Sequence, residues 1–252
     1  YNRSNMQKII LGFLILFSIN ALAQQQTSAK EGGFLKKAGG ILNKVKGGNT
    51  SLSNDEIIAG LKEALSVGAN KSSQKLSALD GFFANAAIKV LMPEEAKKVE
   101  STLRSAGLGS MVDKAILSMN RAAEEASKSA APIFIDAIKQ MSFQDALGIL
   151  KGSDSAATSY LKGKTSGALT VAFKPVIDEA LKKTEATKFW KDVFETYNKL
   201  PTTFKKVNTD LSGYVTDKAL GGLFYQVALE EQKIRKDPAA RVTDVLKKVF
   251  GN

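Results

Sequence analysis

Leu117–Leu150 reads LSMNRAAEEASKSAAPIFIDAIKQMSFQDALGIL, and its helix signals follow one another with almost no loop between them. An alanine-rich helix comes first, and Pro132 is placed to open the first turn of a second helix. Ser142 and Asp145 then form a capping box, the pair of side chains that starts a third helix. This close spacing predicts a fold of packed helices organised around the stretch.

Helix start signals continue toward the N-terminus of this stretch. Ser53 and Glu56 form another capping box, and Pro93 is placed to begin the next helix. Ser110, with Asp113 three residues on, is predicted to cap the alanine-rich helix itself. The N-terminal half of the domain is therefore expected to be helical as well.

The C-terminal half continues the helical pattern, with features that predict irregular packing. We expect a short helix capped by Ser153 and Asp154, and a second helix that Pro175 bends or breaks. Gly221-Gly222 lies inside a long predicted helix and indicates either a close helix contact or a kink. No run alternates with the two-residue period of a strand. The sequence predicts an all-α fold, a single irregular bundle of about eight to ten helices without a sheet.

Two residue types are missing from all 252 positions, and their absence limits the chemistry. Without cysteine, the chain has no disulfide, no thiol nucleophile and no thiolate metal site. Without histidine, it lacks the usual general base near neutral pH and the commonest transition-metal ligand. We expect no metal site and assign no cofactor, and any catalysis would depend on carboxylates, Lys, Tyr, Ser/Thr or a bound cofactor.

Residues 1–23 combine a few upstream residues with the pattern of an export signal. Lys8 supplies a positive charge, and an apolar run follows over 9–19. Ala21-Leu22-Ala23 is a small-residue cleavage site. An uncleaved membrane anchor is the alternative, but the run is much shorter than the roughly 20 residues that a spanning helix needs. We expect a leader that is cleaved after residue 23.

Residues 24–50 form a basic, glycine-rich arm ahead of the helical domain, which we place at 51–252. The arm has five lysines and one glutamate, and so carries +4 of the net charge of +11. Its apolar residues recur at helical spacing, and a cationic amphipathic segment can lie on an anionic membrane surface. A linker, or a short helix docked on the domain, is the alternative. The candidate membrane-surface residues are Phe34, Lys36, Lys37, Ile41 and Lys44.

A family resemblance rests on seven ordered pieces of the sequence. They are LSMNRAAE at 117–124, DAIKQM at 136–141, GSDSAAT at 152–158, YVTDKAL at 214–220, EEQKIR at 230–235, PAAR at 238–241 and LKKVFG at 246–251. With these pieces the chain resembles, from about residue 51 to 251, the bacterial family catalogued as domain of unknown function 4197. The resemblance implies an exported protein of Gram-negative bacteria with an all-helical domain, and it implies no assigned activity. The basic arm lies outside it.

Polar residues gather inside these pieces and form a candidate ligand site. Arg121 can reach Glu124 along its own helix, and the junction at Pro132 could bring Asp136 and Lys139 toward it. One interpretation is a polar cleft that binds a small or anionic ligand. The alternative is a set of ion pairs and caps that fixes the register of the helices. The candidate residues are Asn120, Arg121, Glu124, Asp136, Lys139, Lys218 and Arg235.

Other chemical interpretations find less support. Ser159 and Lys162 match one β-lactamase motif, but the lysine motif that begins at Lys164 lies too close to them in sequence. Adjacent acids such as Glu94-Glu95 point about 100° apart on a helix and chelate a metal poorly. Nucleic-acid binding is not expected, because the basic charge comes without a recognition motif.

Three hypotheses for function remain. The first is a non-enzymatic scaffold or binding module of the periplasm that touches an anionic membrane surface, an envelope polymer or a protein partner. The second is a periplasmic carrier that holds an apolar or anionic small molecule between helices. The third is a histidine-free enzyme that uses a carboxylate with Lys or Tyr, for which no catalytic residue is assigned.

Overall fold

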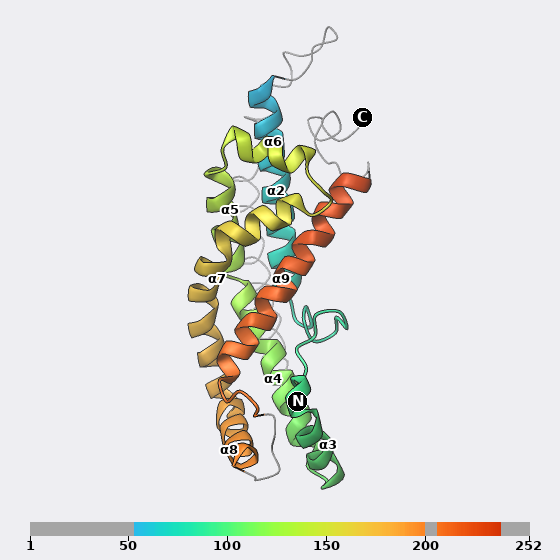
Figure 1. The fold of residues 1–252 in the computed structure, drawn as a ribbon, viewed down its shortest axis with the longest axis vertical. Helices are drawn as coiled ribbons and strands as arrows, with labels where there is room; N and C mark the ends of the chain where they lie inside the picture. Colours follow the sequence, from blue (N-terminus) through green and yellow to red (C-terminus); the bar gives the residue numbers. More distant parts are fainter. Residues whose placement is uncertain (1–52, 200–205, 238–252) are drawn as a thin grey trace, which may run out of the picture. The chain divides into compact units, whose positions relative to one another are not determined.

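Helices account for the regular structure of the described residues, which are 53–199 and 206–237 in a computed structural model of the chain (Figure 1). These residues belong to one compact unit that begins at Ser53, and no strand occurs among them. The predicted all-α class is confirmed, whereas the helix number of the whole chain stays a prediction. The elements are α2 (Asn54–Ser77), the 3-10 turn η1 (Glu94–Ala96), α3 (Lys97–Ser105), α4 (Gly109–Ser127), α5 (Ala130–Lys139), α6 (Phe143–Lys151), α7 (Ala156–Lys183), α8 (Ala186–Asn198) and α9 (Leu211–Lys236).

Two helices begin at the capping boxes that the sequence predicts. The N–H of Glu56 donates to the Ser53 hydroxyl at 3.3 Å, and the N–H of Ser53 donates to the Glu56 carboxylate at 2.8 Å. Ser142 and Asp145 repeat this exchange at 3.2 and 2.9 Å. Side chains within four residues thus satisfy the exposed N–H groups of the first turn, so the local sequence fixes where α2 and α6 begin.

The predicted cap at Ser110 is wrong. Leu108 precedes the first residue of α4, and no side chain caps the first turn of that helix. The chain leaves α3 through Gly107, whose φ of 81° is left-handed, and the N–H of Leu108 donates back to α3 at 2.9 Å. This glycine ending satisfies the last carbonyls of α3 and leads the chain directly into α4. Asp113, which was expected to support the cap, instead accepts a hydrogen bond from Arg104 at 2.8 Å.

Of the two outcomes predicted at Pro175, a bend or a break, the break does not occur, because α7 is one helix of 28 residues. Pro175 removes the N–H that would donate to the carbonyl of Val171. Val171 is 76% exposed, so water can satisfy that carbonyl. Seven buried side chains recur every four residues from Ala157 to Leu181 and hold both halves against the core. A four-residue repeat drifts by about 40° per step around a helix, and α7 accordingly contacts α4, α5, α6, α8 and α9.

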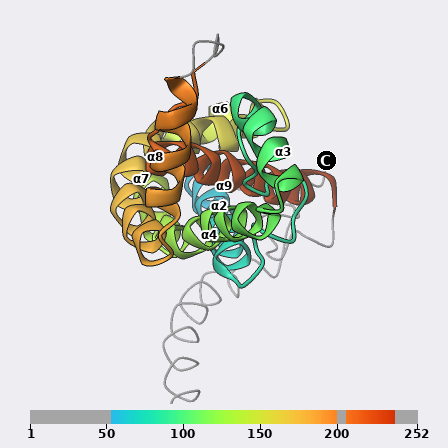
Figure 2. The ribbon, with the colours of Figure 1, turned by 90° about the horizontal axis from the view of Figure 1, so that it is seen from below.

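The α2–α3 connection, residues 78–93, runs partly over the surface but contributes buried side chains to the core. Figure 2 shows α9 in the middle of the unit, where it contacts α2, α4 and α7. Phe82 of the connection is fully buried, as are Phe134 of α5 and Phe173 of α7. Phe134 also meets Phe224 of α9 edge to face, with the ring centroids 5.9 Å apart. The connection therefore has a fixed position between helices.

Gly222 of α9 marks the close contact that its place in the helix predicts. A Cβ atom there would lie 2.5 Å from Cε1 of the buried Phe82, whereas a Cβ atom at Gly221 would meet nothing within 4 Å. We expect Gly222→Ala to lower the free energy of unfolding by about 1–3 kcal/mol through overpacking. Gly221→Ala, the matched control, should raise it by up to about 1 kcal/mol, since alanine favours a helix over glycine. Urea unfolding followed by circular dichroism measures both, and equal changes would contradict the close contact.

Candidate functional site

Asn120, the first of the seven candidate residues, lies in the core of the unit and binds backbone. Its side chain is fully buried. The amide oxygen accepts the N–H of Val90 at 2.8 Å, and the amide nitrogen donates to the carbonyl of Val90 at 2.8 Å and to that of Ile116 at 2.7 Å. Asn120 therefore fixes the end of the 78–93 connection to α4, because it binds both the N–H and the carbonyl of Val90.

Glu124 holds the other end of the same connection. Only 4% of this residue is exposed. Its carboxylate accepts the N–H of Phe82 at 3.1 Å and the N–H of Phe83 at 3.2 Å. It also accepts a hydrogen bond from Nη1 of Arg121 at 2.6 Å, and this bond raises the pKa of Arg121. We call Arg121 and Glu124 the α4 clamp. Glu124 fixes two consecutive backbone amides of a segment about 40 residues away in sequence, and Arg121 holds the Glu124 carboxylate.

Arg121 extends the α4 clamp to the start of the connection. Its Nη2 donates to Asp80 at 2.7 Å, and Asp80 has a left-handed φ of 65°. Asp is one of the few non-glycine residues that adopt this conformation readily. The guanidinium also lies 5.8 Å from the centroid of the Phe83 ring, which Lys89 covers at 3.7 Å. Arg121 thus has a buried carboxylate partner, and that partner, Glu124, holds backbone of the connection.

Glu231 and Arg235 form a second arrangement of the same kind, which we call the α9 clamp. Glu231 is 6% exposed and accepts the N–H of Ala157 at 3.0 Å and the N–H of Thr158 at 2.8 Å. Arg235 donates to Glu231 at 3.0 Å and to the carbonyl of Ile149, near the end of α6, at 2.8 Å. The α9 clamp therefore joins the end of α6 and the start of α7 to α9.

The α9 clamp corrects the predicted start of α7. Ser153 and Asp154 were expected to cap this helix, but the residue before its first turn, Ser155, makes no side-chain capping bond. Glu231 supplies the acceptor from a distant part of the chain, and its negative charge suits the positive end of the helix dipole. Asp154 instead pairs with Lys236 at 2.9 Å. The sequence signal for this role was the i, i+4 spacing of Glu231 and Arg235 inside a family piece.

The remaining candidates lie apart from the two clamps. Asp136 and Lys139 pair with each other at 3.5 Å on the surface of α5, where about 70% of each side chain is exposed. Lys218 is exposed on α9, with its ammonium 5.6 Å from the ring of Tyr214. The structure thus divides the seven candidates among separate sites and does not bring them into one cleft. Ligand binding by these residues stays a prediction.

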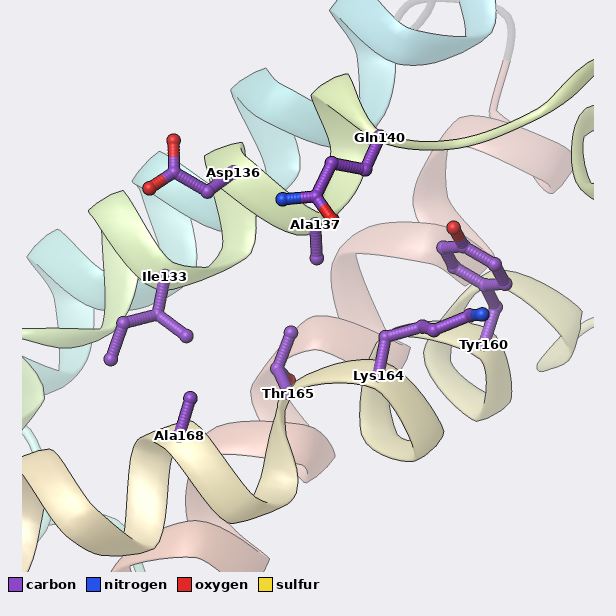
Figure 3. Close-up of a pocket in the computed structure, with 8 residues that line it drawn as sticks. All are labelled: Ile133, Asp136, Ala137, Gln140, Tyr160, Lys164, Thr165 and Ala168. Atoms are coloured by element: carbon purple, nitrogen blue, oxygen red, sulfur yellow. The ribbon is translucent and has the colours of Figure 1, made fainter.

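A pocket lies between α5 and the first half of α7 (Figure 3). Its volume is about 330 Å³, and Asp136 is the only one of the seven candidates that lines it. The ammonium of Lys164 lies 5.7 Å from the ring of Tyr160. Burial, and to a smaller degree the charge of Asp145, raises the pKa of Tyr160, which therefore stays a neutral phenol near pH 7. The lining residues are Ile133, Asp136, Ala137, Gln140, Tyr160, Lys164, Thr165 and Ala168.

The stretch of α7 that borders this space is rich in small and hydroxyl-bearing residues. Between Lys162 and Thr170 the helix carries small residues, including Gly163 and Gly167, neither of which would place a Cβ atom within 4 Å of another group. Three hydroxyl groups in this stretch donate to carbonyls one turn back, at 2.6 to 2.8 Å. Such bonds favour bending of a helix, and α7 changes direction along its length in Figure 1.

The described part of the chain contains neither a cluster of metal ligands nor a membrane-spanning helix. Within residues 53–199 and 206–237, no three Asp or Glu side chains come close enough to hold a metal ion. No helix in these ranges has an apolar stretch long enough to cross a membrane. The candidate membrane-surface residues, Phe34, Lys36, Lys37, Ile41 and Lys44, lie outside the described residues, so their role stays a prediction.

Comparison with known proteins gives one match. The model of a family described as protein of unknown function (DUF4197) matches residues 51–251. No curated protein and no solved structure matches the chain. The matched range contains both clamps, the 78–93 connection and the α5–α7 pocket. Because the match covers most of the chain, this protein belongs to the DUF4197 family.

Proposed function

We propose that this protein is an exported, non-enzymatic module of the bacterial envelope that acts by binding. The proposal rests mainly on Glu124 and Glu231, the two acidic residues of the described part that are more than 90% buried. General acid–base catalysis uses buried carboxylates that face a reactant. Both of these carboxylates instead bind consecutive N–H groups of their own chain, which is the use expected in a stiff scaffold.

The distribution of charge favours the basic arm as the part that binds an anionic surface. The described residues contain twenty-five Lys and Arg against twenty-three Asp and Glu, a net charge of only +2. The arm, residues 24–50, carries +4 on about a seventh as many residues. A dense cluster of lysines beside apolar residues is the composition that binds anionic lipid headgroups. We infer that the helical body is held at the periplasmic face of a membrane by the arm, with an envelope polymer or a protein as the alternative partner.

A carrier of a small molecule is the second candidate function, and the α5–α7 pocket is the observation that favours it. A volume of about 330 Å³ is at the lower end of the range for small-molecule sites. A histidine-free enzyme is the weaker alternative. The Lys164–Tyr160 pair would be its natural centre, but the raised pKa of Tyr160 opposes its use as a base.

Pelleting with phospholipid vesicles tests the role of the arm. Each lysine near an anionic bilayer contributes about 1 kcal/mol of binding. Replacing Lys36, Lys37 and Lys44 together by glutamine should therefore weaken binding to phosphatidylglycerol vesicles by roughly two orders of magnitude. Binding by the unaltered protein should also fall steeply with salt.

A body variant with the same change of charge provides the control. Lys162, Lys182 and Lys188 are exposed on α7 and α8, and their replacement by glutamine should leave vesicle binding nearly unchanged. If the arm variant and the body variant pellet equally well, the arm is not the membrane-binding element. Equal binding to uncharged phosphatidylcholine vesicles would remove the electrostatic mechanism.

A further inference from the structure

We propose that the α5–α7 pocket binds a short-chain amphiphilic carboxylate, with its head beside Lys164 and Tyr160 and its tail along Ile133, Ala137 and Ala168. This inference rests on the carrier function and names its ligand class. It is independent of the arm, because every residue that lines the pocket belongs to α5 or α7 or follows α5 directly.

Hydrogen-bond donors gather at one end of the pocket. Lys164 is exposed, and its ammonium lies 5.7 Å from the centroid of the Tyr160 ring. Figure 3 shows its side chain running toward Tyr160, whereas the amide of Gln140 lies over Ala137 with its nitrogen turned toward Asp136. Tyr160 is a neutral phenol near pH 7 and can donate its O–H. An ammonium and a phenol together suit a carboxylate head, since an ionised acceptor forms the strongest hydrogen bonds with such donors.

Two acidic side chains near this end are already engaged. Asp145 lies close enough to Lys164 to interact with its charge, but its carboxylate accepts the N–H and the hydroxyl of Ser142 in the capping box of α6. Asp136 pairs with Lys139, and in Figure 3 its carboxylate points away from α7. Asp145 keeps its negative charge near Lys164, but it does not line the pocket, and the carboxylate of Asp136 is turned away, so the space beside Lys164 is open.

The other end of the pocket is apolar. Ile133 and Ala137 of α5 face Ala168 of α7 across it. Thr165, at the floor, is 1% exposed, and its hydroxyl donates to the carbonyl of Leu161 at 2.6 Å. Its methyl group is directed at α5 in Figure 3, so the floor is apolar as well. A chain of methylene groups would bury apolar surface here, which favours binding by about 0.8 kcal/mol per fully buried CH₂.

The volume limits the length of the ligand. An apolar cavity of about 150 Å³ holds one benzene molecule, so a volume of about 330 Å³ has room for roughly a dozen non-hydrogen atoms. Octanoate has about this size and the required chemistry, which makes it the probe of choice.

Titration of the full chain with octanoate, followed by amide shifts in nuclear magnetic resonance, tests the site. We expect saturable shifts confined to residues 133–140 and 160–168. Lys164→Met should raise the dissociation constant about fivefold, the effect of losing one partly exposed ion pair. Octanol lacks the carboxylate charge, so its dissociation constant for the unaltered protein should exceed that of octanoate by a similar factor. Ala168→Phe, which fills the apolar end, should raise the constant for octanoate at least tenfold.

Lys162→Met is the matched control, because Lys162 is exposed on the same helix but does not line the pocket. It should leave octanoate binding unchanged. No saturable binding at millimolar octanoate, or the same affinity for Lys162→Met, Lys164→Met and the unaltered protein, would overturn the proposal. All three variants keep the arm, so vesicle binding should persist in them, and failure of the pocket can be told apart from failure of the arm.

Discussion

Replacing Glu124 by alanine is expected to lower the free energy of unfolding by about 3–5 kcal/mol, the range found when one partner of a buried ion pair is removed. The substitution leaves the N–H groups of Phe82 and Phe83 without their acceptor and Arg121 without its buried partner. Urea unfolding measures the loss. Hydrogen exchange should in addition show faster exchange at the amides of Phe82 and Phe83, because these are the groups that the carboxylate protects.

Glu125→Ala is the matched control for this experiment. Glu125 is the next residue of α4 and pairs with Lys128 at 2.6 Å, with the same i, i+3 spacing as Arg121 and Glu124. Both side chains of that pair are more than half exposed, so its loss should change the free energy of unfolding by less than about 1 kcal/mol. Equal destabilisation by the two substitutions would show that the α4 clamp does not hold the connection.

The second large effect is expected at Glu231. Glu231→Ala removes the acceptor for the first turn of α7 and leaves Arg235, whose side chain is only 11% exposed, without its carboxylate. We expect the free energy of unfolding to fall by about 3–5 kcal/mol, which for a chain of this size corresponds to a fall in Tm of about 10 °C. Differential scanning calorimetry measures it directly.

A surface pair on α7 supplies the comparison for Glu231. Glu179 and Lys183 have the same i, i+4 spacing as Glu231 and Arg235 and lie 2.8 Å apart, but about 70% of each side chain is exposed. Glu179→Ala should therefore shift Tm by no more than about 2 °C. If Glu231→Ala behaves like Glu179→Ala, the cap of α7 contributes little to stability.

Features that depend on neighbouring residues could be predicted from the sequence. The capping boxes at Ser53 and Ser142 are confirmed because donor and acceptor lie three residues apart, where helix geometry alone brings them together. The helical class follows from the same local rules. Ser110 was misassigned although its local pattern is similar, since the glycine ending of α3 at Gly107 had already determined how the chain enters α4.

Contacts between distant segments could not be predicted in this way. The sequence grouped Asn120, Arg121 and Glu124 as polar residues of one helix, with a ligand cleft and a structural role both open. What these residues contact is the irregular backbone of the 78–93 connection, and no periodic pattern marks such a segment as their partner. The α5–α7 pocket could not be predicted either. An opening between two helices depends on how their side chains pack against each other, and no sequence motif marks it.

The cap that Glu231 places on α7 cannot form until late in the synthesis of the chain. Ala157 and Glu231 are 74 residues apart, so at about 5–20 residues per second synthesis of the first precedes the second by roughly 4–15 s. Ser155 offers the new helix no side-chain cap during that interval. The start of α7 therefore gains its acceptor only when α9 has been made, and a nascent chain that ends before Glu231 keeps the first turn of its longest described helix open.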